Sequence, residues 1–159
     1  MPARLISNDG EAHFAVEFRS CTQYAHDSGY ESSVTLRGEH WDGDHTFPFS
    51  SSIEGLWLRA ADIVALRNHI ARWIRLPLER LIVADLSAVY ELARLPGQSL
   101  RVRFGRRVDT ISDRHPVFTV FYSAGALQGE FHFVTDQSCL ALFVEELSTE
   151  LVRSHETAM

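Results

Sequence analysis

Hydrophobic residues in the first part of the chain recur at every second position, the period of a β-strand with one buried face. In segment 13–21, Phe14, Val16 and Phe18 share one face and alternate with small or charged residues. Segment 22–32 is mostly polar, so we expect a loop there. The pattern therefore predicts a half-buried first strand followed by a long connection.

Three more strands are predicted before the first helix, at 34–39, 46–49 and 53–58. Asp42-Gly43 lies between the first two, and Asp-Gly is typical of a two-residue hairpin turn because glycine accepts a positive φ cheaply. Pro48 cannot donate a hydrogen bond to a neighbouring strand, so we expect its strand at a sheet edge or at a bulge.

A helical period follows, with Ile63, Leu66 and Ile70 on one face of a helix predicted over 62–75. Asp62 is the expected N-cap, because its carboxylate can accept hydrogen bonds from the free amides of the first turn. Leu76-Pro77 ends the helix.

The second part of the chain repeats this order of elements. Alternation predicts strands at 88–92, 100–104 and 117–122 and a closing strand from Gly129. Segment 117–122 is apolar on both faces and is expected in the centre of a sheet. A helix capped by Thr135 or Asp136 then carries a hydrophobic stripe, formed by Leu140, Val144, Leu147 and Leu151.

An offset of 74 residues aligns the two parts and places Gly55 on Gly129 and Asp62 on Asp136. We therefore predict a single domain over 1–159 with an internal pseudo-repeat, about 12–76 and 86–152. The fold class is α+β: an antiparallel sheet of about eight strands, built as two four-strand-plus-helix halves. Because consecutive antiparallel strands tend to be neighbours, we expect one long sheet with both helices packed on one face.

Composition narrows the class of protein. The chain is 45% hydrophobic, which suffices for one substantial core. No apolar run is long enough to span a membrane and no signal peptide is recognisable at the start, so we expect a cytoplasmic protein. Every basic residue is arginine, which favours a GC-rich bacterial genome.

Charge is segregated along the chain. Residues 1–54 contain nine acidic and three basic residues, whereas 55–116 contain six acidic and eleven basic residues. Residues 117–159 are acidic again, and the formal net charge is −6. An acidic protein does not bind nucleic acid unspecifically, because such binding depends on neutralising phosphates. An acidic surface does suit a basic protein partner.

The histidines around the Asp42-Gly43 turn are the first candidate for chemistry. If the turn has two residues, His40 and His45 are cross-strand neighbours that could share a metal ion, with Asp42 or Asp44 as a third ligand. The alternative is a solvated hairpin tip without a metal. We favour this alternative, so no metal or other cofactor is predicted.

Two other clusters resemble sites but have simpler interpretations. Cys139 follows Asp136 at a helix start, where a thiol can be activated, but Cys139 aligns with Ala65 in the first half, which favours packing. Arg101 and Arg103 form a basic strand without an aromatic platform, since Phe104 lies on the opposite face. We interpret this face as solvated and paired with Glu91. No catalytic residue is predicted.

The order of the elements is combined with a set of spaced residues, which are Asp62-Ile63, Leu66, Phe131-His132-Phe133, Leu140, Phe143 and Glu146-Leu147. In this order and spacing the chain resembles small bacterial immunity proteins of polymorphic toxin systems. The resemblance implies a non-enzymatic protein that binds and blocks a cognate toxin. The family often has an acidic pair before a tryptophan in its second strand, whereas here Trp41 is followed by Asp42.

These observations favour a toxin-neutralising, protein-binding module whose acidic surface contacts a basic partner. The predicted contact is the first hairpin, with residues Glu39, His40, Trp41, Asp42, Asp44 and His45. Two alternatives remain. One is a self-associating structural protein, in which a homodimer forms through an uncovered face or through the edge at Phe47-Pro48-Phe49. The other is a small metal-dependent enzyme that uses His40 and His45.

Overall fold

The computed structural model describes residues 2–7, 9–24, 26–41, 43–75, 88–93, 96–106, 116–124 and 127–157. In this part of the chain the strands are β1 (Ala3–Ile6), β2 (His13–Tyr24), β3 (Asp27–Trp41), β4 (Thr46–Arg59), β5 (Ala88–Ala93), β6 (Gln98–Arg106), β7 (Pro116–Ala124) and β8 (Leu127–Val134). The helices are α1 (Ala60–Arg75) and α3 (Gln137–Thr157). The predicted α+β class, with eight strands in antiparallel order, is confirmed.

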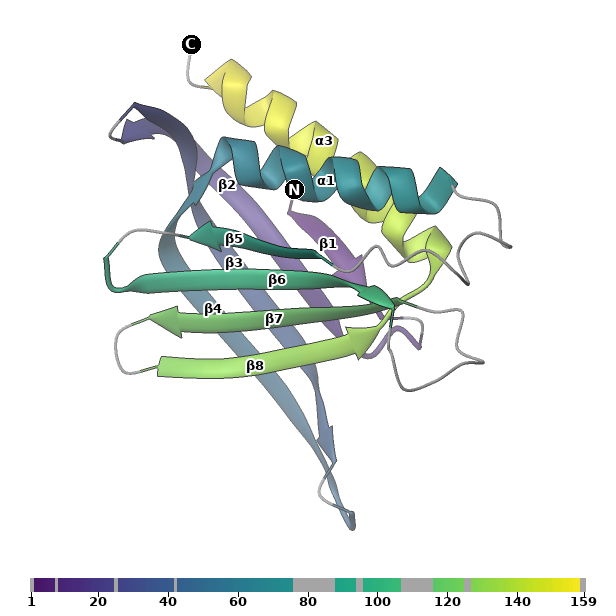
Figure 1. Ribbon diagram of the computed structural model, residues 1–159. Helices are drawn as coiled ribbons and strands as arrows, with labels where there is room; N and C mark the ends of the chain where they lie inside the picture. The colour runs from purple at the N-terminus through teal and green to yellow at the C-terminus, as the bar shows by residue number, and fades with distance from the viewer. Residues whose placement is uncertain are drawn as a thin grey trace.

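The sheet is folded between its two halves. Each strand pairs antiparallel with its neighbour in the chain, but among the described residues β4 and β5 share one residue pair, Leu58 with Ala93. Figure 1 shows the consequence: strands β5–β8 run across strands β1–β4 instead of continuing beside them. The expected long sheet therefore consists of two four-stranded parts that face each other.

The core fills the space between these two parts. Phe14 of β2 packs against Phe118 of β7, with ring centroids 5.1 Å apart, and Phe49 of β4 stacks on Phe131 of β8 at 6.0 Å. Gly38 of β3 is buried directly under the Phe131 ring. A side chain at this glycine would push the two parts of the sheet away from each other.

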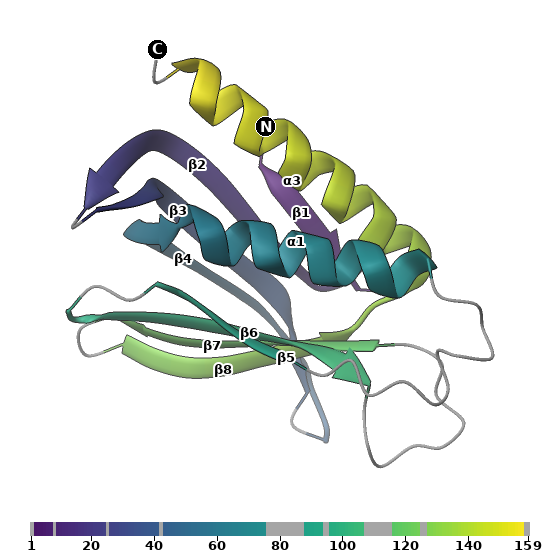
Figure 2. The same cartoon turned by 45° about the horizontal axis from the view of Figure 1, so that its top comes forward.

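Both helices cover the inner side of the folded sheet, as predicted (Figures 1 and 2). Helix α3 lies on β1 and β2, where Phe143 meets Phe14 at 6.3 Å. Helix α1 contacts β3, β4 and β5, and its Trp73 packs edge-on against Phe104 of β6 at 5.6 Å. None of the described helices is both long enough and apolar enough to cross a membrane.

The prediction of a loop at 22–32 is wrong, because most of this segment belongs to β2 and β3. The Trp57 ring of β4 lies against Gly29 of β3, so closely that a methyl group at Gly29 would collide with the indole. The indole Nε1 also donates a hydrogen bond to Thr22 Oγ1 at 3.1 Å. A tryptophan from the next strand thus holds together a hairpin whose own residues are polar.

Three other features of the secondary structure differ from the prediction. Segments 46–49 and 53–58 belong to one 14-residue strand, β4, and the short strand β1 was not predicted. Helix α1 begins at Ala60, so Asp62 lies inside its first turn and is not the N-cap. The Asp62 carboxylate accepts two hydrogen bonds from the Arg59 guanidinium, both of 3.0 Å.

The predicted cap of α3 is confirmed and belongs to a junction of three elements. Asp136 Oδ1 accepts a hydrogen bond from the Cys139 amide at 2.9 Å. Thr135 is fully buried, and its hydroxyl donates to the Ile6 carbonyl of β1 at 2.8 Å. The Gln137 side chain donates to the Ile74 carbonyl in the last turn of α1 at 2.8 Å. Three consecutive residues therefore connect β1, α1 and α3.

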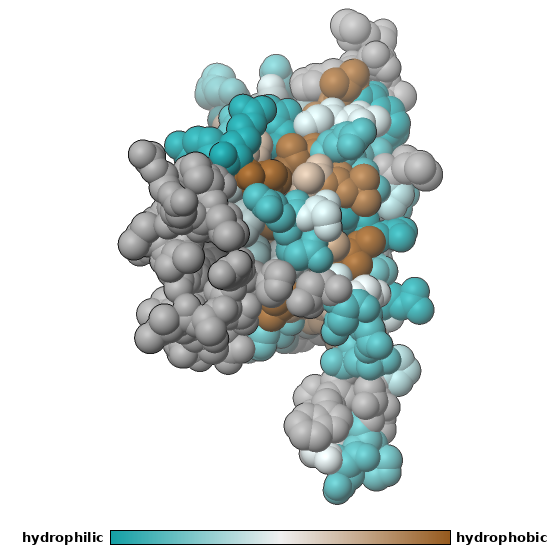
Figure 3. All heavy atoms as spheres, turned by 90° about the vertical axis from the view of Figure 1, so that its right-hand side faces the viewer, coloured by the Kyte–Doolittle hydropathy of each residue, from teal (hydrophilic) through white to brown (hydrophobic). Residues whose placement is uncertain are grey.

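The hairpin of β3 and β4 extends far beyond the rest of the molecule. It forms the long projection at the bottom of Figure 1, and its described side chains are mainly hydrophilic in Figure 3. We call residues 37–50 the hairpin arm.

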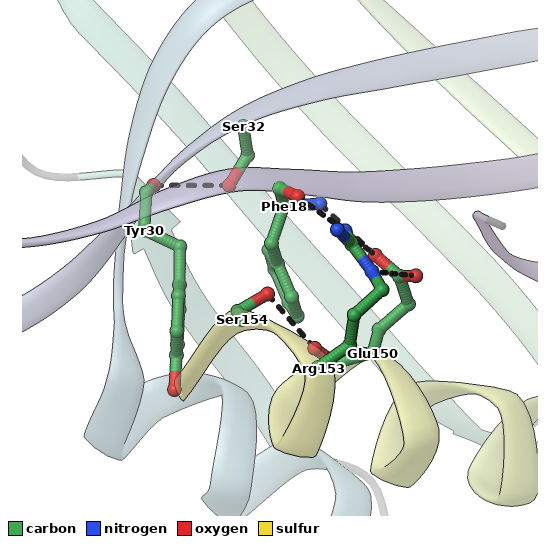
Figure 4. Close-up of polar contacts among 6 residues, drawn as sticks. All are labelled: Phe18, Tyr30, Ser32, Glu150, Arg153 and Ser154. Atoms are coloured by element: carbon green, nitrogen blue, oxygen red, sulfur yellow. Dashed lines mark hydrogen bonds and ion pairs between the residues drawn. The ribbon is translucent and has the colours of Figure 1, made fainter. Parts of the chain in front are cut away.

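Helix α3 satisfies the backbone of β2 where β1 no longer covers it. The ladder between β1 and β2 ends at the pair Ala3 with Val16. Beyond it, the Phe18 amide donates to Glu150 Oε2 at 3.3 Å, and the Phe18 carbonyl accepts from Arg153 Nη2 at 2.6 Å (Figure 4). Arg153 and Glu150 also form a salt bridge with each other, with 2.9 Å between Nη2 and Oε2. Glu146 closes the edge of β1 by accepting from the Arg4 amide at 2.8 Å.

Replacing Glu150 by Gln tests this contact. The Glu150 carboxylate is only 2% exposed, and the variant loses charge-assisted hydrogen bonds, so we expect the free energy of unfolding to fall by about 2 kcal/mol. Urea denaturation measures this loss. Glu145→Gln, on the exposed side of the same helix, should change stability by less than about 0.5 kcal/mol.

The effect of Glu150→Gln should depend on pH. Burial raises the pKa of Glu150, but hydrogen bonds from Arg153 and from the Phe18 amide outweigh burial, and the pKa is lowered from its ordinary 4.5. A lowered pKa means that the carboxylate stabilises the fold above about pH 4.5 and that this contribution is lost as the pH falls through the folded-state pKa. The difference between wild type and variant should therefore shrink in acid, and a constant difference would contradict this role.

Candidate partner-binding hairpin

The register of the hairpin arm corrects the predicted turn. Trp41 pairs with Thr46 and His40 pairs with Phe47, so the connection covers the four residues 42–45 and is not a two-residue turn. Gly43 has a φ of 103°, the conformation for which a glycine was expected here. Asp42 lies outside the described residues.

This register removes the geometric basis for a metal site. His40 lies opposite Phe47 on the neighbouring strand, whereas His45 lies in the loop, so the two histidines are not cross-strand partners. No group of three or more His, Cys, Asp or Glu side chains that could hold a metal ion occurs in the described ranges.

The predicted contact residues nevertheless belong to one projecting element. Glu39, His40 and Trp41 are consecutive at the end of β3, and Asp44 and His45 follow in the loop. The side chains of Glu39, Asp44 and His45 are exposed. The side chains of His40 and Trp41 are outside the described part of the structure.

A further acidic residue, Glu11, lies next to Glu39 at the base of the arm. The sequence pattern did not predict that these two residues are neighbours. Glu11, in the connection between β1 and β2, is hydrogen-bonded to Glu39, and both side chains are exposed. The pKa of Glu11 is raised, first by this hydrogen bond, then by the negative charge of Glu39 and then by that of Asp9. Two carboxyl groups that share a proton repel each other when both are ionised.

A tight turn holds Glu11 in this position. Asp9 Oδ1 accepts hydrogen bonds from the Ser7 hydroxyl at 2.5 Å and from the Glu11 amide at 3.0 Å. The Ser7 hydroxyl in turn accepts from the Ala12 amide at 3.0 Å. These hydrogen bonds lower the pKa of Asp9, the one from Ser7 most strongly. Asp9, Glu11 and Glu39 therefore form an acidic cluster at the base of the arm, which we call the basal acidic cluster.

The outer face of β5–β8 has an aromatic platform, contrary to our expectation. Arg101 lies over the ring of Phe121, its cross-strand partner on β7, with 5.3 Å between the guanidinium carbon and the ring centroid. Both residues line a shallow groove of about 450 Å³, together with Glu130 of β8. The expected pairing of Arg101 with Glu91 across β5 and β6 is present in the register. Glu91 and Glu130 offset the basic charge of this face.

Cys139 lacks the properties of an activated nucleophile. Burial raises the pKa of its thiol, and the Asp136 carboxylate raises it further. The side chain is half-buried and packs against the core, as expected from its place on the helix. The alignment with Ala65 was not a sound reason for this, because Ala65 is exposed.

Comparisons with known proteins do not place the chain in a family. No protein-family model and no curated protein matches it. Among solved structures it is similar to the plant transcriptional regulator PBF-2, at 14% identity and a TM-score of 0.42, over 99% of this chain and 86% of that one. A similarity at this level carries no argument about function.

Replacing Glu11 by Gln tests the repulsion in the basal acidic cluster. Because the folded-state pKa of Glu11 is raised, ionisation of Glu11 destabilises the fold as the pH rises above its ordinary value of 4.5. We expect Glu11→Gln to have a slightly higher melting temperature than wild type at pH 7 and the same one well below pH 4.5. Differential scanning calorimetry at the two pH values decides this. Glu145→Gln should show no such pH-dependent gain.

Proposed function

We propose that the protein is a non-enzymatic binding module that contacts a basic protein through its hairpin arm. The observation that carries this proposal is the arm itself: its base packs on Phe131 through Gly38 and Phe49, whereas its tip projects beyond the folded sheet (Figures 1 and 3). The arm exposes Glu39, Asp44 and His45. In keeping with the resemblance stated above, the partner is a toxin, and binding blocks its activity.

The basal acidic cluster supports a basic partner. Glu11 and Glu39 are adjacent carboxyl groups at the surface, and their proximity raises the pKa of Glu11. A guanidinium or ammonium group placed beside them relieves this repulsion, so the same arrangement that is unfavourable in the free protein favours a cationic partner. The formal net charge of −6 also speeds the encounter with a basic protein at low ionic strength.

The alternatives have weaker support from the geometry. The edge at Phe47-Pro48-Phe49 was a candidate for self-association, but the Phe49 ring is stacked on Phe131 within the same molecule. The metal-dependent enzyme required His40 and His45 to be opposite each other, whereas His40 is opposite Phe47.

Charge reversal on the arm tests the proposal. The first candidate partner is the protein encoded by the gene next to that of this chain. Isothermal titration calorimetry measures its affinity for wild type, Glu39→Lys and Asp44→Lys. We expect each variant to weaken binding by about tenfold or more, mainly through slower association at low salt. Glu145→Lys, with the same charge change on the exposed side of α3, serves as the matched control.

The proposed toxin blockade is measured separately. Cells that produce the partner should survive when they also produce the wild-type protein, and should survive less well with Glu39→Lys. Thermal melts establish that the variants are folded. Equal affinity of the arm variants and the control would overturn the role of the arm. Binding of the partner without any gain in cell survival would overturn the proposal that the partner is a toxin.

A further inference from the structure

Strand β8 ends the sheet with an open edge. It is hydrogen-bonded to β7 and to no other strand of the described residues. The opposite end of the sheet is different, because Glu146 accepts a hydrogen bond from the Arg4 amide of β1. Within the described ranges, a helix thus closes one terminal edge, and the other is available for pairing with another strand.

Strand β8 lacks the bulge, the proline and the inward-pointing charge that prevent pairing at many sheet edges. Its eight residues pair with β7 without a bulge, and none of them is proline. The side chains that point inward include Phe131 and Phe133, and neither is charged. A regular edge of this kind is a ready template for a further strand.

The sequence of β8 is complementary to itself. In an antiparallel pair with a two-fold axis at Phe131, Glu130 of each copy lies opposite His132 of the other. Both side chains are exposed on the outer face, so the two copies form two pairs of an acid and an imidazole. An axis at Glu130 would place two carboxylates opposite each other. An axis midway between two residues would pair an outer-face side chain of one copy with an inner-face side chain of the other.

The inner face of the same edge also favours a second copy. Phe131 is only partly buried, although it stacks on Phe49 and lies against Phe133 at 5.7 Å. With the axis at Phe131, the Phe131 rings of two copies become neighbours and cover each other. Apolar contact on one face and charge pairing on the other then act at the same register.

We propose that two copies of this chain associate through antiparallel pairing of their β8 strands, centred on Phe131. The result is a two-fold symmetric dimer whose sheet continues from one copy into the other. The dimer does not depend on the proposed function, because no residue of the hairpin arm (37–50) pairs with the second copy, although Phe49 of the arm lies against Phe131 within each copy. One strand of eight residues makes a small interface, so the dimer is reversible and forms at high protein concentration.

Sedimentation velocity over a concentration series tests the dimer. We expect wild type to shift from monomer to dimer as the concentration rises, and the amides of 128–134 to exchange with deuterium more slowly in the same range. A wild-type protein that remains monomeric at every concentration, or exchange that is independent of concentration, would overturn the proposal.

A charge exchange tests the register. His132→Glu places two carboxylates opposite each other at both pairs, and we expect the dissociation constant to rise by about tenfold or more. The double variant Glu130→His/His132→Glu restores opposite partners and should dimerise like wild type. Glu145→His on α3 should have no effect. A double variant that is as weak as the single variant would show that β8 does not pair at Phe131.

Discussion

Backbone groups that are buried at the edge of a sheet have to find partners, and α3 provides them for β1 and β2. Strand β2 continues well past the end of β1, and Glu150 and Arg153 take up the amide and carbonyl of Phe18 at the point where β1 is missing. Glu146 does the same for the Arg4 amide of β1. Because these contacts are to backbone atoms, they determine where α3 lies along both strands. The position of α3 then determines where its first residues meet β1 and α1, through Thr135 and Gln137.

The weak connection between β4 and β5 shapes the two surfaces that we propose as interfaces. In the described part of the chain, one residue pair, Leu58 with Ala93, forms the backbone ladder between the halves, so the halves can fold over each other and bury Phe14 against Phe118. In this crossed arrangement β3 and β4 run past the edge of the β5–β8 part and form the hairpin arm (Figure 1). The same fold leaves β8 as a terminal strand whose edge is not covered by α3. The arm and the β8 edge are thus consequences of one fold, although their proposed partners differ.

Local periodicity predicted most of the elements, because each part of the sheet has one buried and one exposed face. Phe14, Val16 and Phe18 show this clearly, and β2 was recognised from them. What the pattern could not predict depends on residues distant in sequence. The polar hairpin at 22–32 is held by Trp57, and the basal acidic cluster brings Glu11 to Glu39 across 28 positions. The order of the strands was predictable, but the fold between β4 and β5 was not, since one residue pair leaves no periodic signal.

Asp62 and Asp136 show why similar positions in the two halves have different roles. The 74-residue offset aligns them, and both stand near the start of a helix. Asp136 precedes α3 and caps it, whereas Asp62 lies within α1 and its carboxylate is bound by Arg59. Position 133, which aligns with Arg59, is a phenylalanine in the core, so no guanidinium competes for Asp136. The role of each carboxylate depends on where its helix begins and, for Asp62, on Arg59, and a repeat in hydrophobic pattern preserves neither.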